Sequence, residues 1–246
     1  MMADSTYFIR PAEEAFKAGY LQMPTVPTAD FQTTYPWAEY PVNTILVVAS
    51  IVFFLFVLDS FLHCAPYVFR CCTMPRDNFR IEDSVPLVRS RNWTFFSTLL
   101  PFSLIASRYG FFDLDLIMEQ PAEWKSLLVY AFFLLFILLR FIIYKIATPI
   151  RGNLEPYRVA HRSAMNFFIV YTILMLVTTA VLKLLNVDLS TAQQVFLWET
   201  AIIYILYLLV KTQIFASSYG LLRTFLYLCG LELLPAAALV AAILWL

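Results

Sequence analysis

Residues 124–147 read WKSLLVYAFFLLFILLRFIIYKIA, an apolar run with one charge far from its ends, Arg140. At about 1.5 Å per residue a helix of this length extends roughly 36 Å, enough to cross the roughly 30 Å hydrocarbon core of a bilayer. The run also lacks the alternation of apolar and polar side chains that a barrel strand requires. It predicts a transmembrane helix.

Comparable apolar segments lie on both sides of this run. They cover residues 42–62, 93–112, 164–185, 195–215 and 221–246. The segment at 93–112 is the weakest, because Pro101 interrupts it and Arg108 must reach water from its end. The chain is 61% hydrophobic and 14% charged, whereas soluble domains are about 25% charged. We therefore expect an all-α, polytopic membrane protein with a bundle of about six transmembrane helices.

Arginine and lysine gather in alternate gaps between these segments, which sets the expected orientation. Cytoplasmic loops of membrane proteins are enriched in positive charge. This bias predicts that the first, third and fifth loops are cytoplasmic and that both termini lie outside. Residues 1–40 are then an extracytoplasmic arm, a short amphipathic helix followed by a proline-rich extended segment, and residues 41–246 form the transmembrane domain. No signal-peptide pattern opens the chain.

Arg140 and Glu232 are charges expected deep within two of the helices. Counted from the cytoplasmic ends of their helices, they lie about 12 Å and about 13.5 Å deep. Charges inside a membrane are costly, and by default they are functional candidates. An interhelical ion pair would relieve the cost, because the planar guanidinium fork fits a carboxylate. Two readings stay open: a structural pin between helices, or part of a path for substrate, lipid or protons.

Pro235 follows Glu232 by three residues and predicts a kink, because it removes a backbone donor and frees the carbonyl of residue 231. A carboxylate and a freed carbonyl would then form a polar site near the kink. On the preceding helix, Tyr204, Tyr207 and Lys211 follow one face, a stripe more typical of a core or an interface than of a binding site. Lys211 is interpreted as an anchor that extends to the membrane surface.

Asp59 and His63 are four residues apart near the end of the first helix and would share a face. They form a candidate polar pair, either an acid–base pair or a satisfied contact at the membrane edge.

The first and third loops are rich in arginine and could form one basic surface. Such segments can contact anionic lipid headgroups. The arginines can equally be explained by their effect on membrane topology alone. The candidate headgroup contacts are Arg70, Arg76, Arg80, Arg89, Arg91, Arg151, Arg158 and Arg162.

Several functional classes lack support in the sequence. The formal net charge is zero, which gives no reason to expect nucleic acid. The four cysteines show no disulfide framework or zinc spacing, so free thiols and no metal are expected. No nucleotide-binding loop, hydrolase nucleophile motif or metalloprotease motif is present, and no cofactor is expected.

Residues 225–235, FLYLCGLELLP, resemble the closing signature of an uncharacterised Bacteroidota integral-membrane family, catalogued as domain of unknown function 4271. The match includes Tyr227, Cys229, Glu232 and Pro235, with Gly230 at a variable position. The resemblance implies a bacterial inner (cytoplasmic) membrane. It implies no activity.

Three functions follow as hypotheses. The first is a non-enzymatic accessory or scaffold subunit of the cell envelope that binds membrane lipids, a protein partner or a second copy of itself. The second is a carrier or flippase for an anionic lipid or metabolite, with Arg140 and Glu232 at its polar centre. The third is a membrane enzyme acting on a lipid phosphate.

Overall fold

The computed structural model describes residues 37, 40–111, 124–147, 155–217, 220, 224–225, 228–233 and 237. Within these ranges every regular element is helical: α2 (Pro41–Cys71), α3 (Pro75–Asp83), α4 (Val85–Arg108), α6 (Lys125–Ala147), α7 (Glu155–Leu184), α8 (Leu189–Ala216) and the π-helical turn η2 (Cys229–Leu233). The all-α fold is therefore confirmed for the described part of the chain. The N-terminal arm to residue 36, Arg151, Pro235 and most of 221–246 lie outside it.

Four of the described helices, α2, α6, α7 and α8, are long and apolar enough to cross a membrane. Many of their large apolar side chains are exposed, for example Phe56, Leu135 and Leu197. A soluble protein would bury most of such a surface, whereas lipid can cover it. These features support a helical membrane protein.

The predicted second span, 93–112, differs from the helix observed there. Helix α4 begins earlier, at Val85, runs through Pro101 and ends at Arg108, and it is not among the four apolar helices. Most of its hydroxyl side chains are buried and donate to carbonyls one turn back, as those of Thr94, Ser97 and Thr98 do. Local bonding of this kind lets Ser and Thr sit in a helix interior without a distant partner.

The predicted loop between the first two spans is also largely helical. Helix α2 continues past Pro66 to Cys71, and α3 follows after a short turn, with Pro75 at its first position. Proline suits that position because the first turn of a helix has no acceptor for its N–H groups. The basic segment is thus a folded helical layer.

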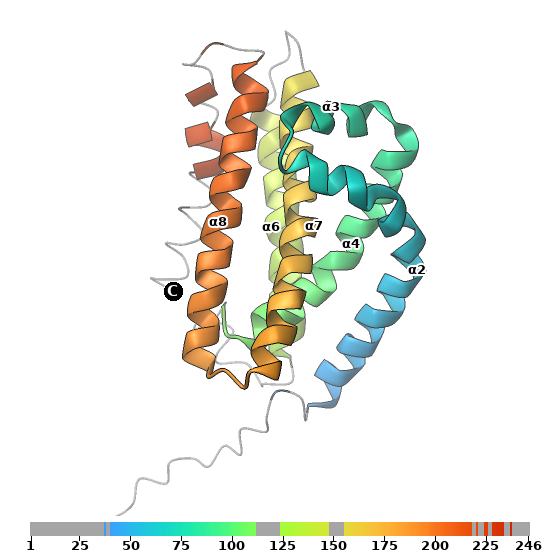
Figure 1. Cartoon of the computed structure of the whole chain (residues 1–246), viewed down its shortest axis with the longest axis vertical. Helices are drawn as coiled ribbons and strands as arrows, with labels where there is room; N and C mark the ends of the chain where they lie inside the picture. Colours follow the sequence, from blue (N-terminus) through green and yellow to red (C-terminus); the bar gives the residue numbers. More distant parts are fainter. Residues whose placement is uncertain are drawn as a thin grey trace, which may run out of the picture. The chain divides into compact units, whose positions relative to one another are not determined.

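The basic segments lie together at one end of the helices. The carboxyl end of α6 contacts the start of α7, where the rings of Tyr144 and His161 stack with centroids 3.9 Å apart. Near the same point of α7, Arg162 binds Glu82 of α3. The end of α8 lines a groove with residues 73–77 and Phe79. Figure 1 shows α3 beside the start of α7.

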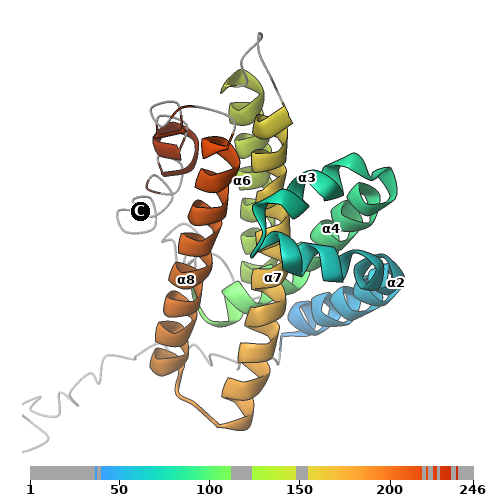
Figure 2. The same ribbon diagram turned by 45° about the horizontal axis from the view of Figure 1, so that its top comes forward.

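The opposite ends of the helices meet as well. Gln193 at the start of α8 donates to the carbonyl of Tyr109 at the end of α4, over 2.7 Å. The hydroxyls of Ser107 and Ser126 join the end of α4 to the start of α6, 2.9 Å apart. Successive long helices therefore alternate in direction, and in Figures 1 and 2 α7 and α8 run side by side while α2 and α4 are inclined to them.

Aromatic side chains fill the space between α4, α6 and α7. The ring of Phe102 meets those of Phe133 and Phe168 edge-on, with centroids 4.7 Å and 4.9 Å apart. Edge-to-face pairs of this kind stabilise packing by roughly 0.5–1.5 kcal/mol beyond their buried area. This core packs α6, which carries Arg140, against α4 and α7.

Candidate functional site

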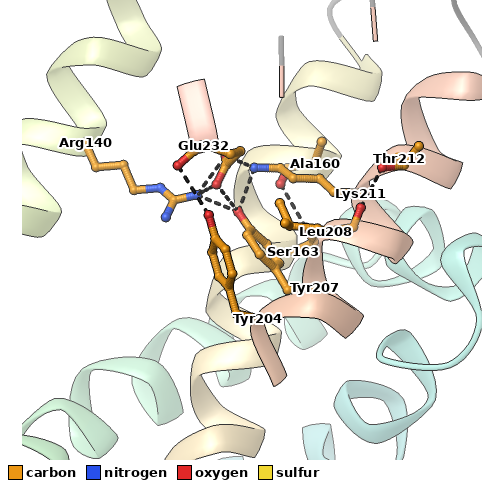
Figure 3. Close-up of polar contacts among 9 residues, drawn as sticks. All are labelled: Arg140, Ala160, Ser163, Tyr204, Tyr207, Leu208, Lys211, Thr212 and Glu232. Atoms are coloured by element: carbon orange, nitrogen blue, oxygen red, sulfur yellow. Dashed lines mark hydrogen bonds and ion pairs between the residues drawn. The ribbon is translucent and has the colours of Figure 1, made fainter. Parts of the chain in front are cut away.

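A cluster of charged and phenolic side chains joins α6, α8 and η2 (Figure 3). Helix α6 contributes Arg140, α8 contributes Tyr207 and Lys211, and η2 contributes Glu232. Positions 207 and 211 are one helical turn apart, so both face the same neighbour. We call these four residues the charge cluster.

The carboxylate of Glu232 is contacted by three donor groups of the charge cluster. Nη2 of Arg140 lies 2.9 Å from Oε1 and 2.8 Å from Oε2. The hydroxyl of Tyr207 donates to Oε2 over 2.7 Å, and Nζ of Lys211 forms an ion pair with Oε1. An ionised carboxylate offers about four acceptor positions. Both oxygens of Glu232 are therefore engaged by donors of the protein itself.

The Tyr207 hydroxyl is the second centre of the cluster. It accepts from Nη2 of Arg140 over 2.6 Å and from Nζ of Lys211 over 2.7 Å, while donating to Glu232. A phenolic hydroxyl has one donor and two acceptor positions, and all three are used. Tyr207 thus bonds to each of the three charged members of the cluster.

The charges are largely removed from solvent. The side chain of Lys211 is 0% exposed, that of Glu232 is 4% exposed and that of Arg140 is 27% exposed. Removing one partner of a buried ion pair typically costs about 3–5 kcal/mol, because the other charge stays buried. The pairing therefore ties the C-terminal turn η2 to α6 and α8.

The sequence expectation for Arg140 and Glu232 agrees with the contact observed, but the geometry differs. One nitrogen of Arg140 reaches both carboxylate oxygens, in place of the two-nitrogen fork expected. The expected kink at Pro235 lies outside the described residues. Immediately before it, Glu232 lies in a π-helical turn, and such turns are a common cause of helix kinks.

The interpretation of Lys211 as a membrane-surface anchor is wrong. Lys211 was expected to extend to the membrane surface, yet the structure buries it against Glu232. The helical stripe of Tyr204, Tyr207 and Lys211 was the available signal, because all three approach Glu232. The residue that all three approach, Glu232, lies in η2, and the spacing of residues along α8 cannot identify it.

A second ionic group ties three helices at the basic end. Glu82 of α3 pairs with Arg91 of α4, and both side chains are nearly fully buried. The other carboxylate oxygen of Glu82 lies 2.5 Å from Nη1 of Arg162 on α7. Arg91 also donates to the side-chain oxygen of Asn92 over 3.2 Å. We call Glu82, Arg91 and Arg162 the arginine clamp.

The arginine clamp corrects one candidate headgroup contact. Arg91 was expected at a lipid-facing surface, but its side chain is only 1% exposed. Arg89 and Arg91 are two residues apart on α4 and therefore point about 200° apart around the helix. Arg89 is exposed as a result, and Arg70, Arg76, Arg80 and Arg158 are exposed as well. Arg151 lies outside the described residues.

The expected pairing of Asp59 and His63 is not observed. Both side chains are exposed on α2, and within the described residues no hydrogen bond or ion pair joins them. All four cysteines are free thiols, as expected. Burial raises the pKa of Cys72, just after α2, to about 12.

Metal ligation finds no support in the part of the chain that the structure describes, which contains no cluster of three His, Cys, Asp or Glu side chains suited to an ion. The chemistry that the described sites offer is charge pairing between helices. No protein-family model, curated protein or solved structure matches this chain, and the resemblance of residues 225–235 to the Bacteroidota family stays a prediction.

Proposed function

We propose that this chain is a non-enzymatic accessory or scaffold subunit of the bacterial inner membrane that binds a lipid or protein partner in the cell envelope. The observation that carries the proposal is the pairing of the buried Glu232 carboxylate with two cations and a phenol of the protein. Both of its oxygens are bound by protein donors, from Arg140, Tyr207 and Lys211. A catalytic or transport carboxylate needs a position for substrate or a transferable proton, whereas a structural pin does not.

The arginine clamp supports the same reading. Both carboxylate oxygens of Glu82 are paired with arginines from other helices, and the carboxylate is buried. Two internal ionic groups, one at the basic end and one within the bundle, hold several helices in fixed relative positions. Buried polar groups of this kind can specify one arrangement of helices, and a fixed arrangement suits a scaffold more than a carrier that must alternate between states.

The orientation belongs to the proposal as well. The alternating helices and the gathering of basic segments at one end support six crossings, with α4 and residues 221–246 included, the basic end in the cytoplasm and both termini outside. Single cysteines test this in intact cells. Thr73→Cys should react with a membrane-impermeant maleimide only after the membrane is opened, and Thr191→Cys should react in intact cells. The reverse pattern would overturn the orientation.

A transport assay tests the accessory role against the carrier. The purified chain is reconstituted into liposomes that contain a fluorescent anionic phospholipid, and dithionite bleaching reports movement between leaflets. We expect the same bleached fraction as in protein-free liposomes. Accelerated movement by the wild-type chain would replace the scaffold with a carrier, and Arg158→Gln, which changes an exposed arginine outside the charge cluster, should then behave as the wild type does.

A further inference from the structure

A groove of about 350 Å³ runs along the outer face of α4. It lies at the first three turns of the helix, at the end where the basic segments gather. Its lining combines one cation, one amide and four apolar side chains: Val85, Val88, Arg89, Asn92, Trp93 and Phe96. None of these lining residues is acidic.

Arg89 is the charged group of the groove. It is exposed, and its side chain makes no ion pair or hydrogen bond with any residue that the structure describes. Its neighbour Arg91, on the other side of α4, is by contrast bound to Glu82. The groove therefore presents a guanidinium whose donors face outward, and guanidinium groups bind phosphate with strong, directional hydrogen bonds.

Asn92 supplies a second donor next to Arg89. Its side-chain oxygen accepts from Arg91, which the buried Glu82 holds in place. Because the oxygen of the amide is directed to Arg91, its NH₂ group is left to face the groove. Arg89 and Asn92 are three residues apart and lie side by side on the helix. Together they offer donors to one anion.

The remaining lining suits the glycerol and acyl part of a lipid. Trp93 and Phe96 are about half exposed, and Val85 is more so. Phe96 lies about 10 Å along α4 from Arg89, on the side away from the basic end. Tryptophan is enriched where the hydrocarbon region meets the headgroups. The order of cation, indole and phenyl ring follows the order of phosphate, glycerol and chain in a phospholipid.

The geometry points to a phospholipid site with an anionic headgroup in this groove, with the phosphate on Arg89 and Asn92 and an acyl chain along Trp93 and Phe96. It rests on the proposed function, of which it names the lipid class. Because no carboxylate lines the groove, nothing there would pair with the ammonium of a zwitterionic headgroup. The second groove, beside Arg76, contains Asp77 and lacks this preference.

Native mass spectrometry of the full chain tests the site. The protein is titrated with phosphatidylglycerol or with phosphatidylethanolamine, and bound lipid is counted. We expect one tightly held phosphatidylglycerol and about tenfold weaker binding of it in Arg89→Gln, the effect of losing one charged hydrogen-bond partner. Arg158→Gln removes the same charge from an exposed position outside the groove and should leave binding unchanged.

Two further variants separate a built site from general attraction to a basic surface. Asn92→Asp keeps the oxygen that accepts from Arg91 but places a carboxylate where the amide donor stood, so phosphatidylglycerol binding should fall at least as far as in Arg89→Gln. Trp93→Ala changes no charge and should weaken binding several-fold. Equal losses in Arg89→Gln and Arg158→Gln, or unchanged binding in Asn92→Asp, would overturn the site.

The two proposals fail in different ways. Loss of the lipid site leaves the liposome assay unaffected and the accessory role intact. Acceleration of lipid movement across the bilayer contradicts the accessory role whether or not Arg89 holds a lipid.

Discussion

Lys211 and Glu232 form an ion pair from which solvent is almost excluded, although 20 residues separate them in the chain. One lies in α8 and the other in the turn η2. The pair is completed by Arg140 and by the hydroxyl of Tyr207, so the buried charges of Lys211 and Glu232 meet donors and acceptors of the protein.

Replacing Glu232 with Gln should destabilise the protein strongly. The substitution leaves the buried ammonium of Lys211 without its counter-charge, and breaking a buried pair in this way costs about 3–5 kcal/mol. Lys211→Met should cost less, because Arg140 and Tyr207 still bind Glu232. Thermal unfolding in nanodiscs measures both. A larger loss in Lys211→Met than in Glu232→Gln would contradict the assigned roles.

Replacing Tyr207 with Phe should cost about 1–3 kcal/mol, because one hydroxyl serves as donor to Glu232 and as acceptor for two cations. Tyr204→Phe is the matched control on the same helix face. The Tyr204 hydroxyl makes a long contact of 3.5 Å with the backbone carbonyl of Glu232, so its removal should change the unfolding temperature little. Equal effects of the two substitutions would show that Tyr207 is not the centre of the cluster.

The arginine clamp should tolerate the loss of one arginine much better than the loss of the other. Arg91 is fully buried, whereas the side chain of Arg162 is 37% exposed. Arg91→Met should therefore destabilise the protein more than Arg162→Met. Solvent screens the more exposed ion pair between Arg162 and Glu82, and water can replace the hydrogen bond that this pair loses. Unfolding temperatures in the same nanodiscs decide this. A larger effect at Arg162 would contradict the burial observed.

Cys72 should resist alkylation until the solution is strongly alkaline. Burial raises the pKa of its thiol to about 12, and the thiolate is the reactive form. The thiol therefore stays protonated through pH 7–9. Thr73→Cys, in a chain whose native cysteines are replaced by Ala, serves as an exposed control whose labelling should rise near pH 8.5. Equal rates for the two cysteines at pH 8 would contradict the burial of Cys72.

Asp188 should stabilise the start of α8 over most of the pH range. Hydrogen bonds from Ser190 and from the backbone N–H of Thr191 lower the pKa of its carboxyl to about 2. A lowered pKa means that the contribution is fully present above about pH 4 and is lost as the pH falls toward 2. Hydrogen exchange in the first turn of α8 should rise in Asp188→Ala at pH 7, and much less in Asp188→Asn, which keeps a capping side chain.

The helical fold and one contact of the charge cluster could be predicted from the sequence. Apolar length identifies α2, α6, α7 and α8, and the expected depths of Arg140 and Glu232 place them at one level. The depth of a residue along its helix, however, does not tell which neighbouring helix its side chain faces. The sequence therefore predicts a surface position for Lys211, whereas packing against η2 buries its side chain.

The basic segment shows a second limit of the sequence. Charge composition predicts that residues 64–92 lie outside the hydrocarbon region, but it does not tell which arginine finds a partner. Arg91 binds Glu82 because the turn between α3 and α4 brings them together, and Arg89 faces outward because it lies on the other side of the helix. The prediction that Asp59 pairs with His63 has a different weakness. A spacing of four residues allows the two side chains to meet, but because both are exposed, solvent can satisfy each of them separately.

The most direct test of the account exchanges the charges of Lys211 and Glu232. Each single variant, Lys211→Glu and Glu232→Lys, places like charges together in a buried site, and we expect either to unfold well below the wild-type temperature in nanodiscs. The double variant restores one opposite pair beside Arg140 and should recover much of that loss, an interaction measured by a double-mutant cycle. Single variants that unfold at the wild-type temperature, or a double variant whose losses simply add, would show that the pair does not hold η2 to α8.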